Sequence, residues 1–386
     1  MSIFQYPAFG PAFVVMVFLL LRSQKSVRAQ GDEFRHAIDL TQSGKLGDAE
    51  LAWRQLVQSH PSNASVHAAL GIVLAEEGKL DQAAMEYRQA LALNPHEPEV
   101  SMNLGLAEFK AGHFAAAIEP LTAANKEKPQ DTRSVLLLGM SYFGLRSYAK
   151  AVPYLKAAMD SDRSNMELHQ VLAQSCLWSA NYTCAMTEYT SILTSNPNSV
   201  QAHMLLGQAL DSMNRSPEAI AELETAARIA PTEPNVHFEL GYLYFTGHQY
   251  ERAAAEFALE LKNNPLHAQA CAYLGDIKLR TNDDAEAEAL LSKAIKLQND
   301  LRIAYLDLGQ IYAKQKRNQE ALTSFLRAEE LDPRNADAHY RLARLYTVLG
   351  NREKAQVEFA RTRELHSKEA DSLIEKVSGG SGARWQ

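Results

Sequence analysis

The sequence predicts an all-α fold made of ten copies of one helical hairpin, each 34 residues long. Alanine recurs at this period with no insertion or deletion between residues 30 and 369. A second position of the repeat always carries a small residue, and a third always carries a large apolar residue. We therefore expect the same packing contacts in every copy. The recurring alanines are Ala49, Ala83, Ala117, Ala151, Ala185, Ala219, Ala253, Ala287, Ala321 and Ala355.

The position that always carries a small residue lies in the first helix of each repeat. Counting place 1 from Gln30 and from every 34th residue after it, place 8 is glycine in seven repeats and alanine in three. A glycine inside a helix costs about 1 kcal/mol relative to alanine, so we expect it to permit a close contact, with place 8 facing the alanine at place 20. Place 24 carries the large apolar side chain, for example Trp53 or Phe257. The place-8 residues are Ala37, Gly71, Gly105, Gly139, Ala173, Gly207, Gly241, Gly275, Gly309 and Ala343.

Turn and proline signals complete the hairpin. Glycine falls between the two halves of four repeats, at Gly44, Gly78, Gly112 and Gly350, where a tight turn needs a permissive backbone. Proline closes seven repeats, since it lacks a backbone donor and disfavours helix in the residue before it. The closing prolines are Pro61, Pro95, Pro129, Pro197, Pro231, Pro265 and Pro333, with Arg163 and Asn299 in their place in repeats four and eight.

This pattern resembles the tetratricopeptide repeat (TPR) family, whose units combine Leu-Gly in the first helix, Ala early in the second and a closing Pro. The resemblance covers residues 30–369, although His mostly stands where the family has an early Trp. It implies a right-handed superhelical solenoid of about ten antiparallel helix-turn-helix repeats, with the first helices lining a concave groove.

Residues 1–29 differ from the repeats and are predicted to be a signal peptide or a membrane anchor. Ala12–Leu21 is an unbroken apolar run, and cleavage after Val27-Arg28-Ala29 would release a chain that starts at Gln30. Arg22, Lys25 and Arg28 follow the run rather than precede it, which favours an anchor, but the run is short for a bilayer. We expect an exported protein, periplasmic or secreted, with membrane anchoring through residues 1–29 as the alternative.

Residues 370–386 are predicted to form a helical cap over the last repeat and then a disordered Gly/Ser-rich tail. The formal net charge is −7, and it becomes more negative without the basic leader. Because phosphate neutralisation needs clustered Lys and Arg, we do not expect a nucleic-acid partner.

No pattern of catalytic residues is found, so we expect neither an enzyme nor a cofactor. Cys176 and Cys184 lie in opposite helices of repeat five; we favour two small buried thiols over a disulfide, and Cys271 has no evident partner. Histidine recurs at place 4, but helices about 8–10 Å apart do not bring equivalent side chains to one metal ion. We therefore expect half-buried fillers rather than metal ligands. These histidines are His67, His169, His203, His237 and His339.

The candidate binding surface is the stripe formed by places 5, 9 and 12 of the first helices. Its apolar side chains and amides in repeats three to seven suit a groove for a peptide or helix. Any single ring could instead fill a gap between neighbouring first helices. The groove residues are Met102, Leu106, Phe109, Leu136, Met140, Phe143, Gln170, Gln174, Leu177, Trp178, Met204, Gln208, Asp211, Phe238, Tyr242 and Phe245.

The sequence therefore predicts a scaffold or adaptor that binds a protein or peptide partner in its concave groove. Place 9 contains no Asn, so the clamp that some family members use for a partner's terminal carboxylate is not expected. Two alternatives remain: a structural solenoid that self-associates without a foreign ligand, and a thiol-redox protein that uses Cys176 and Cys184.

Overall fold

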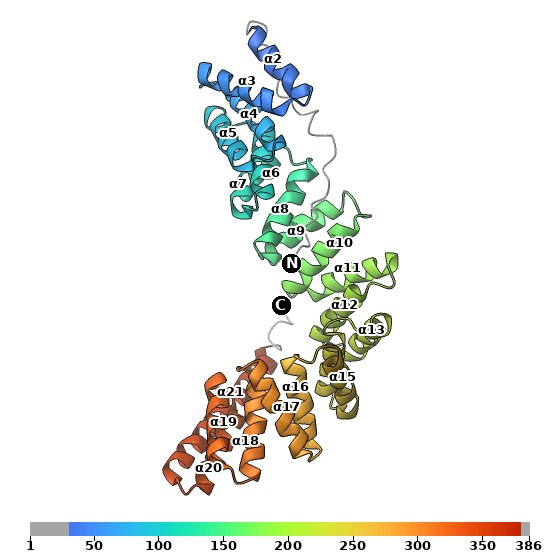
Figure 1. Cartoon of the computed structure of the whole chain (residues 1–386), viewed down its shortest axis with the longest axis vertical. Helices are drawn as coiled ribbons and strands as arrows, with labels where there is room; N and C mark the ends of the chain where they lie inside the picture. The colour runs from blue at the N-terminus through green and yellow to red at the C-terminus, as the bar shows by residue number, and fades with distance from the viewer. Residues whose placement is uncertain (1–30, 380–386) are drawn as a thin grey trace. The chain divides into compact units, whose positions relative to one another are not determined.

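The computed structural model describes residues 31–379, with side chains as far as residue 368, and this part of the chain is entirely helical. It forms twenty α-helices and no strand, and the two helices of each repeat pack against each other as a hairpin (Figure 1). The predicted all-α repeat fold is confirmed. The expected leader, residues 1–29, and residues 380–386 of the expected tail lie outside the described residues.

Two compact units make up the chain, Met1–Pro197 and Asn198–Gln386. The first holds the hairpins of repeats one to five. Its helices are α2 (Asp32–Gln42), α3 (Leu46–Ser59), α4 (Ala64–Glu76), α5 (Leu80–Leu93), α6 (Pro98–Lys110), α7 (Phe114–Glu127), α8 (Thr132–Gly144), α9 (Tyr148–Met159), α10 (Met166–Trp178) and α11 (Tyr182–Ser195).

The second compact unit holds the hairpins of repeats six to ten. Its last helix is twice the usual length and runs on through the segment expected to cap the array. The helices are α12 (Val200–Ser212), α13 (Ser216–Ile229), α14 (Val236–Thr246), α15 (Tyr250–Asn263), α16 (Ala268–Arg280), α17 (Asp284–Leu297), α18 (Arg302–Lys314), α19 (Asn318–Leu331), α20 (Ala336–Val348) and α21 (Arg352–Gly379).

Side-chain caps fix where many first helices begin. Asn63 accepts a hydrogen bond from the backbone N–H of Ser65, and Asn335 accepts one from Ala338. Asp131 and Asn165 cap α8 and α10 in the same way. These side chains satisfy N–H groups that have no partner within the helix, so the same place starts each of these hairpins.

The core repeats with the sequence period, but one predicted contact is wrong. The alanines at place 20 are buried as expected. The glycines at place 8 face mainly the large side chain at place 24 rather than the alanine: a Cβ added to Gly71 would lie 2.7 Å from Cε1 of Tyr87, and one added to Gly275 would lie 2.7 Å from Cγ of Leu291. The missing side chain makes room for the largest core residue, not for a second small one.

The turn between the two helices uses a left-handed residue in all ten repeats. Gly78 has φ +78°, and the other three predicted turn glycines are similar. The remaining six repeats place a residue other than glycine in the same conformation, which costs about 1–2 kcal/mol for most residues with a Cβ and less for asparagine. These residues are Arg146, Ala180, Asn214, His248, Asn282 and Lys316.

Replacing Ala180 by glycine is therefore expected to raise the free energy of unfolding by about 0.5–1 kcal/mol, after allowance for the greater freedom of glycine in the unfolded chain. The reciprocal change Gly78→Ala should lower it by a similar amount, because a Cβ at Gly78 meets no atom within 4 Å and only backbone strain acts. Chemical denaturation of both variants measures the two changes in the free energy of unfolding. Changes of the same sign in the two variants would contradict this prediction.

Closing prolines are not required to end the second helices. In repeat eight, which has Asn299 instead, α17 still ends at Leu297, the same place as its counterparts. In repeat four, which has Arg163, α9 ends two residues earlier than that place, at Met159. The hairpin packing therefore ends the helix, and proline reinforces the end.

The recurrent histidines are buried and hydrogen-bonded rather than half-buried fillers. In each case Nδ1 lies 2.6 Å from a glutamate Oε2 on the second helix of the same repeat. Nε2 of His67 also lies 3.1 Å from the carbonyl oxygen of Pro61, which closes the preceding repeat. The histidines thus tie helix to helix within a repeat. The pairs are His67–Glu86, His169–Glu188, His203–Glu222, His237–Glu256 and His339–Glu358.

Candidate functional site

The predicted groove residues of repeat three do not form an open surface. Met102, Leu106 and Phe109 on α6 are only 4%, 9% and 5% exposed. They belong to a core cluster that also contains Leu121 of α7 and Leu137 of α8. The prediction of these three as groove lining is therefore wrong, because side chains at places 5, 9 and 12 of this repeat are used in packing between neighbouring helices.

Repeats four and five present a more open surface on α8 and α10. Leu136, Met140, Phe143 and Gln174 are half-buried, Gln170 is exposed and Leu177, contrary to the prediction, is buried. Trp178 is 51% exposed, and its ring lies 6.0 Å from Phe143 and 4.8 Å from Tyr148, centre to centre. This exposed aromatic cluster lies within the first compact unit.

In the second compact unit, the predicted residues on α12 and α14 also divide by exposure. Gln208 is exposed, Met204 and Asp211 are half-buried, and Phe238 is buried in contrast to the prediction. Tyr242 and Phe245 remain half-buried on α14. These two rings are the predicted residues of this unit that combine an aromatic surface with access from solvent.

A residue that the sequence analysis missed joins the two rings. Tyr273 on α16 lies 5.5 Å from Tyr242 and 5.0 Å from Phe245, and Tyr250 lies 5.7 Å from Phe245, all between ring centroids. Tyr273 occupies place 6, which the selection of places 5, 9 and 12 left out. We call Tyr242, Phe245, Tyr250 and Tyr273 the aromatic wall.

A charged pocket continues this surface. Tyr273, Asp276 and Arg280 are spaced at i, i+3 and i+7 and so share one face of α16. The Arg280 guanidinium lies 5.2 Å from the ring centre of Tyr250. The pocket has a volume of about 380 Å³. It is lined by Asp276, Leu279 and Arg280 of α16, by Arg302, Ile303, Leu306, Asp307 and Gln310 of α18, and by Asp337 and Arg341 of α20.

The electrostatics of this pocket centre on Asp307. Burial, with the charge of Asp276 beside it, raises the pKa of the Asp307 carboxyl well above its ordinary value, although Arg341 and Arg280 act in the opposite direction. Arg280 donates from Nε to Asp276 across 2.6 Å. The sequence alone does not indicate that this carboxyl is buried, because its burial depends on contacts between repeats.

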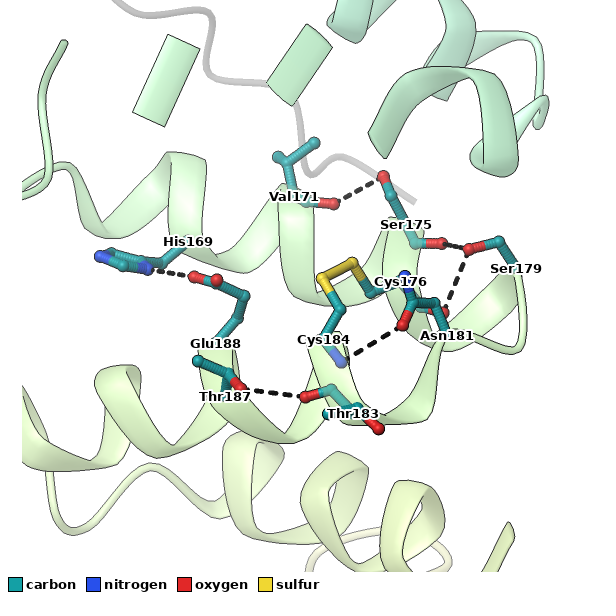
Figure 2. Close-up of a disulfide and its surroundings, with 10 residues drawn as sticks. All are labelled: His169, Val171, Ser175, Cys176, Ser179, Asn181, Thr183, Cys184, Thr187 and Glu188. Carbon is teal, nitrogen blue, oxygen red and sulfur yellow. Dashed lines mark hydrogen bonds and ion pairs between the residues drawn. A yellow bond between two sulfur atoms is a disulfide. The ribbon is translucent and has the colours of Figure 1, made fainter. Parts of the chain in front are cut away.

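The two cysteines of repeat five are joined, which corrects the preference for separate thiols. The Cys176 and Cys184 sulfur atoms are 2.05 Å apart and link α10 to α11 (Figure 2). Figure 2 also shows the His169–Glu188 pair joining the same two helices. Both cysteines are buried, which favours a structural crosslink over thiol exchange with a partner. Cys271 is a buried free thiol whose pKa is raised by burial.

Thiol counting under denaturing conditions is expected to find one free cysteine without reductant and three with it. Because the bridge closes a short loop, replacing Cys184 by serine should lower the free energy of unfolding by about 2–3 kcal/mol. Three titratable thiols in the untreated, oxidised protein would show that the bridge is absent. An unchanged denaturation midpoint in the variant would show that the bridge does not stabilise the hairpin.

The structure offers no metal site in its described part. Among the side chains of residues 31–368, no group of three His, Cys, Asp or Glu is placed to hold one ion. Nor is any helix between residues 31 and 379 both long enough and apolar enough to cross a bilayer.

Comparison with known proteins gives the same fold. One family model, described as tetratricopeptide repeat, matches residues 34–98, 69–132, 172–234 and 238–301. A second, described as TPR repeat, matches residues 309–350, and a third, described as tetratricopeptide repeat, matches residues 132–165. The first model alone covers more than half of the chain. The chain belongs to the tetratricopeptide repeat family. No curated protein matches the sequence.

Solved structures share this architecture at low sequence identity. The Naa15/Naa10 complex bound to HypK-THB aligns with a TM-score of 0.51 and 16% identity, covering 87% of this chain and 63% of that chain. The C-terminal part of a TPR repeat-containing protein from Cytophaga hutchinsonii aligns with a TM-score of 0.50 and 18% identity, covering 62% of this chain and 99% of that chain. Likenesses at these identities concern the fold alone.

Proposed function

We propose that this TPR protein is a scaffold that holds a segment of a partner protein along the first helices of its second compact unit. The observation that carries the proposal is the aromatic wall, on α14, α16 and the first residue of α15, whose half-buried rings adjoin the charged pocket of α16, α18 and α20. Rings supply apolar contact area at low entropic cost, and polar groups beside them fix the orientation of a bound segment.

Binding rather than catalysis is supported by the chemistry of this surface. The polar side chains of the pocket are carboxyls, guanidinium groups and one amide, and no nucleophile with an adjacent base lines it. TPR proteins in general act as protein-interaction scaffolds. The buried disulfide in repeat five likewise supports a structural role for its cysteines.

We also propose that the chain is exported. The apolar run Ala12–Leu21 supports this, and so does the disulfide, because such bridges persist in oxidising compartments. Amino-terminal sequencing of the protein from its native cells should find Gln30 as the first residue. An intact Met1 on a membrane-bound protein would favour the anchor, and an intact Met1 on a cytosolic protein would contradict both.

The aromatic wall can be tested with a double variant, Tyr242→Ala with Phe245→Ala. Removing two rings from the centre of a binding surface is expected to weaken capture of the native partner by more than tenfold, because central aromatic residues dominate such interfaces. The matched control is Leu259→Ala, an exposed leucine on the second helix α15 of the same repeat. Quantitative affinity capture measures the effect in variants with unchanged helicity; equal capture by all three proteins would overturn the proposal.

A further inference from the structure

The charged pocket on α16, α18 and α20 is lined by three aspartates and three arginines, but these do not pair one to one. Two of its arginines have carboxylate partners on their own helices. Arg280 Nε lies 2.6 Å from Asp276 Oδ2, and Arg341 Nε lies 3.0 Å from Asp337 Oδ2. Arg341 also donates to Gln310 of α18. These two guanidinium groups are therefore already neutralised within the protein.

The third arginine is also paired, which leaves one carboxyl over. Arg302 Nε lies 3.5 Å from Asp332 Oδ2, beyond the end of α19. Asp307 forms no ion pair with any of the three arginines within 4 Å. With Asp332 included, four aspartates share three arginines, and the carboxyl left without an arginine is that of Asp307.

Asp307 is also buried without a complete set of hydrogen bonds. The residue is 7% exposed, and no donor among the described residues reaches its Oδ2 atom, although a hydrogen bond between its carboxyl and that of Asp276 also raises the pKa of Asp307. A buried oxygen without a donor costs free energy that a ligand donor would recover. Asp307 lines the pocket together with Asp276 of the neighbouring repeat, so a group that enters the pocket meets two carboxyls.

The rest of the lining suits a long aliphatic stem. Leu279, Ile303 and Leu306 give the pocket an apolar wall beside the two carboxyls. Lysine and arginine side chains pack their methylene groups on apolar surface while their charged ends meet polar groups. The volume of about 380 Å³ is ample for one such side chain.

We propose that the Asp307 pocket accepts a lysine or arginine side chain of the bound partner, whose cationic end donates hydrogen bonds to Asp307 and Asp276. Leu279, Ile303 and Leu306 contact its aliphatic stem. The inference rests on the proposed function for the source of this side chain, a protein segment held along the same helices. It adds a specificity: the segment carries a basic residue next to the part that contacts the aromatic wall.

Binding of the cation is coupled to release of a proton. Burial and the neighbouring Asp276 raise the pKa of Asp307 and favour its neutral form. The groups that face it are Asp276 and Arg280 on α16 and Arg341 on α20, with Gln310 on its own helix. A bound cation stabilises the carboxylate, so the proton leaves to solvent and affinity rises with pH until Asp307 is already ionised in the free protein.

Small cations test the pocket without the native partner. The probes are N-acetyl-arginine amide and N-acetyl-lysine amide, with N-acetyl-norleucine amide as the neutral probe of similar shape. We expect saturable shifts of the Asp307 carboxyl signal in NMR spectra of the full-length protein with the two cations and none with norleucine amide. The affinity for the cations should rise with pH.

The variant Asp307→Asn keeps the size of the side chain and removes its charge, and it should bind the cations at least about tenfold more weakly. Asp300→Asn, an exposed change just before α18, is the matched control and should bind as the unmodified protein does. Equal binding by Asp307→Asn, equal binding of norleucine amide, or no saturable binding of either cation would overturn the proposal. A failure of the aromatic wall test with intact cation binding would refute the proposed function alone.

Discussion

Replacing Gly71 by valine is expected to lower the free energy of unfolding by about 2–4 kcal/mol. A Cβ at this position would lie 2.7, 2.8 and 3.1 Å from three atoms of the Tyr87 ring. That ring is fully buried between α4 and α5, and an aromatic ring in a packed core cannot turn away without moving its neighbours. The two helices must therefore separate, and chemical denaturation should report the loss.

Gly47→Val provides the matched control for this change. Gly47 also lies in a helix, α3, but a Cβ there would meet no atom within 4 Å. Its replacement should change the free energy of unfolding by less than about 0.5 kcal/mol. If both variants lost the same stability, the small residue at place 8 would not be explained by close packing against place 24.

Replacing Asp307 by asparagine is expected to abolish a pH dependence of stability. Because the pKa of Asp307 is raised in the folded protein, the folded state holds a proton that the unfolded state has lost. The stability from this group is complete below the ordinary carboxyl pKa of about 3.9 and falls as pH rises toward the folded pKa, by up to about 1.4 kcal/mol per pH unit. Asparagine cannot ionise, so the variant should lack this slope.

Denaturant titrations at a series of pH values, carried out on the original protein and on Asp307→Asn, measure this difference. Asp300→Asn again serves as the control, because that carboxyl is exposed and its loss should leave the slope unchanged. A parallel pH dependence of the original protein and Asp307→Asn would show that Asp307 is ionised in the folded state.

The hairpins could be predicted from the sequence because each repeat packs in the same way against its neighbours. Ala49 and its counterparts fix the phase of every second helix, and the turn glycines locate four of the ten turns. Ala180 and Lys316 show why glycine does not mark the other turns: tertiary packing imposes a left-handed conformation on residues that do not favour it.

The candidate site was less predictable, because exposure depends on the neighbouring repeat. Places 5, 9 and 12 selected Tyr242 and Phe245 correctly as accessible rings but also selected Met102, which packing buries. The same places of repeats eight and nine contain Asp276 and Gln310, and these line the charged pocket. They were left out because the candidate surface was confined to repeats three to seven, where apolar side chains cluster.

The pairing of His67 with Glu86 illustrates a signal that was present but not used. Glutamate follows the place-4 histidine by 19 residues in all five repeats that have one, which places the two on facing helices of one hairpin. A periodic polar pair of this kind indicates a structural hydrogen bond, whereas a histidine column considered alone suggests a filler or a metal ligand.

Hydrogen exchange of the full-length protein, measured alone and with its captured partner, shows which helices the partner contacts. We predict that the partner slows exchange mainly in α14, α16 and α18, the first helices that carry Tyr242, Phe245, Tyr273 and the Asp307 pocket. Protection confined to the second helices α15, α17 and α19, or equal protection along the whole array, would contradict it.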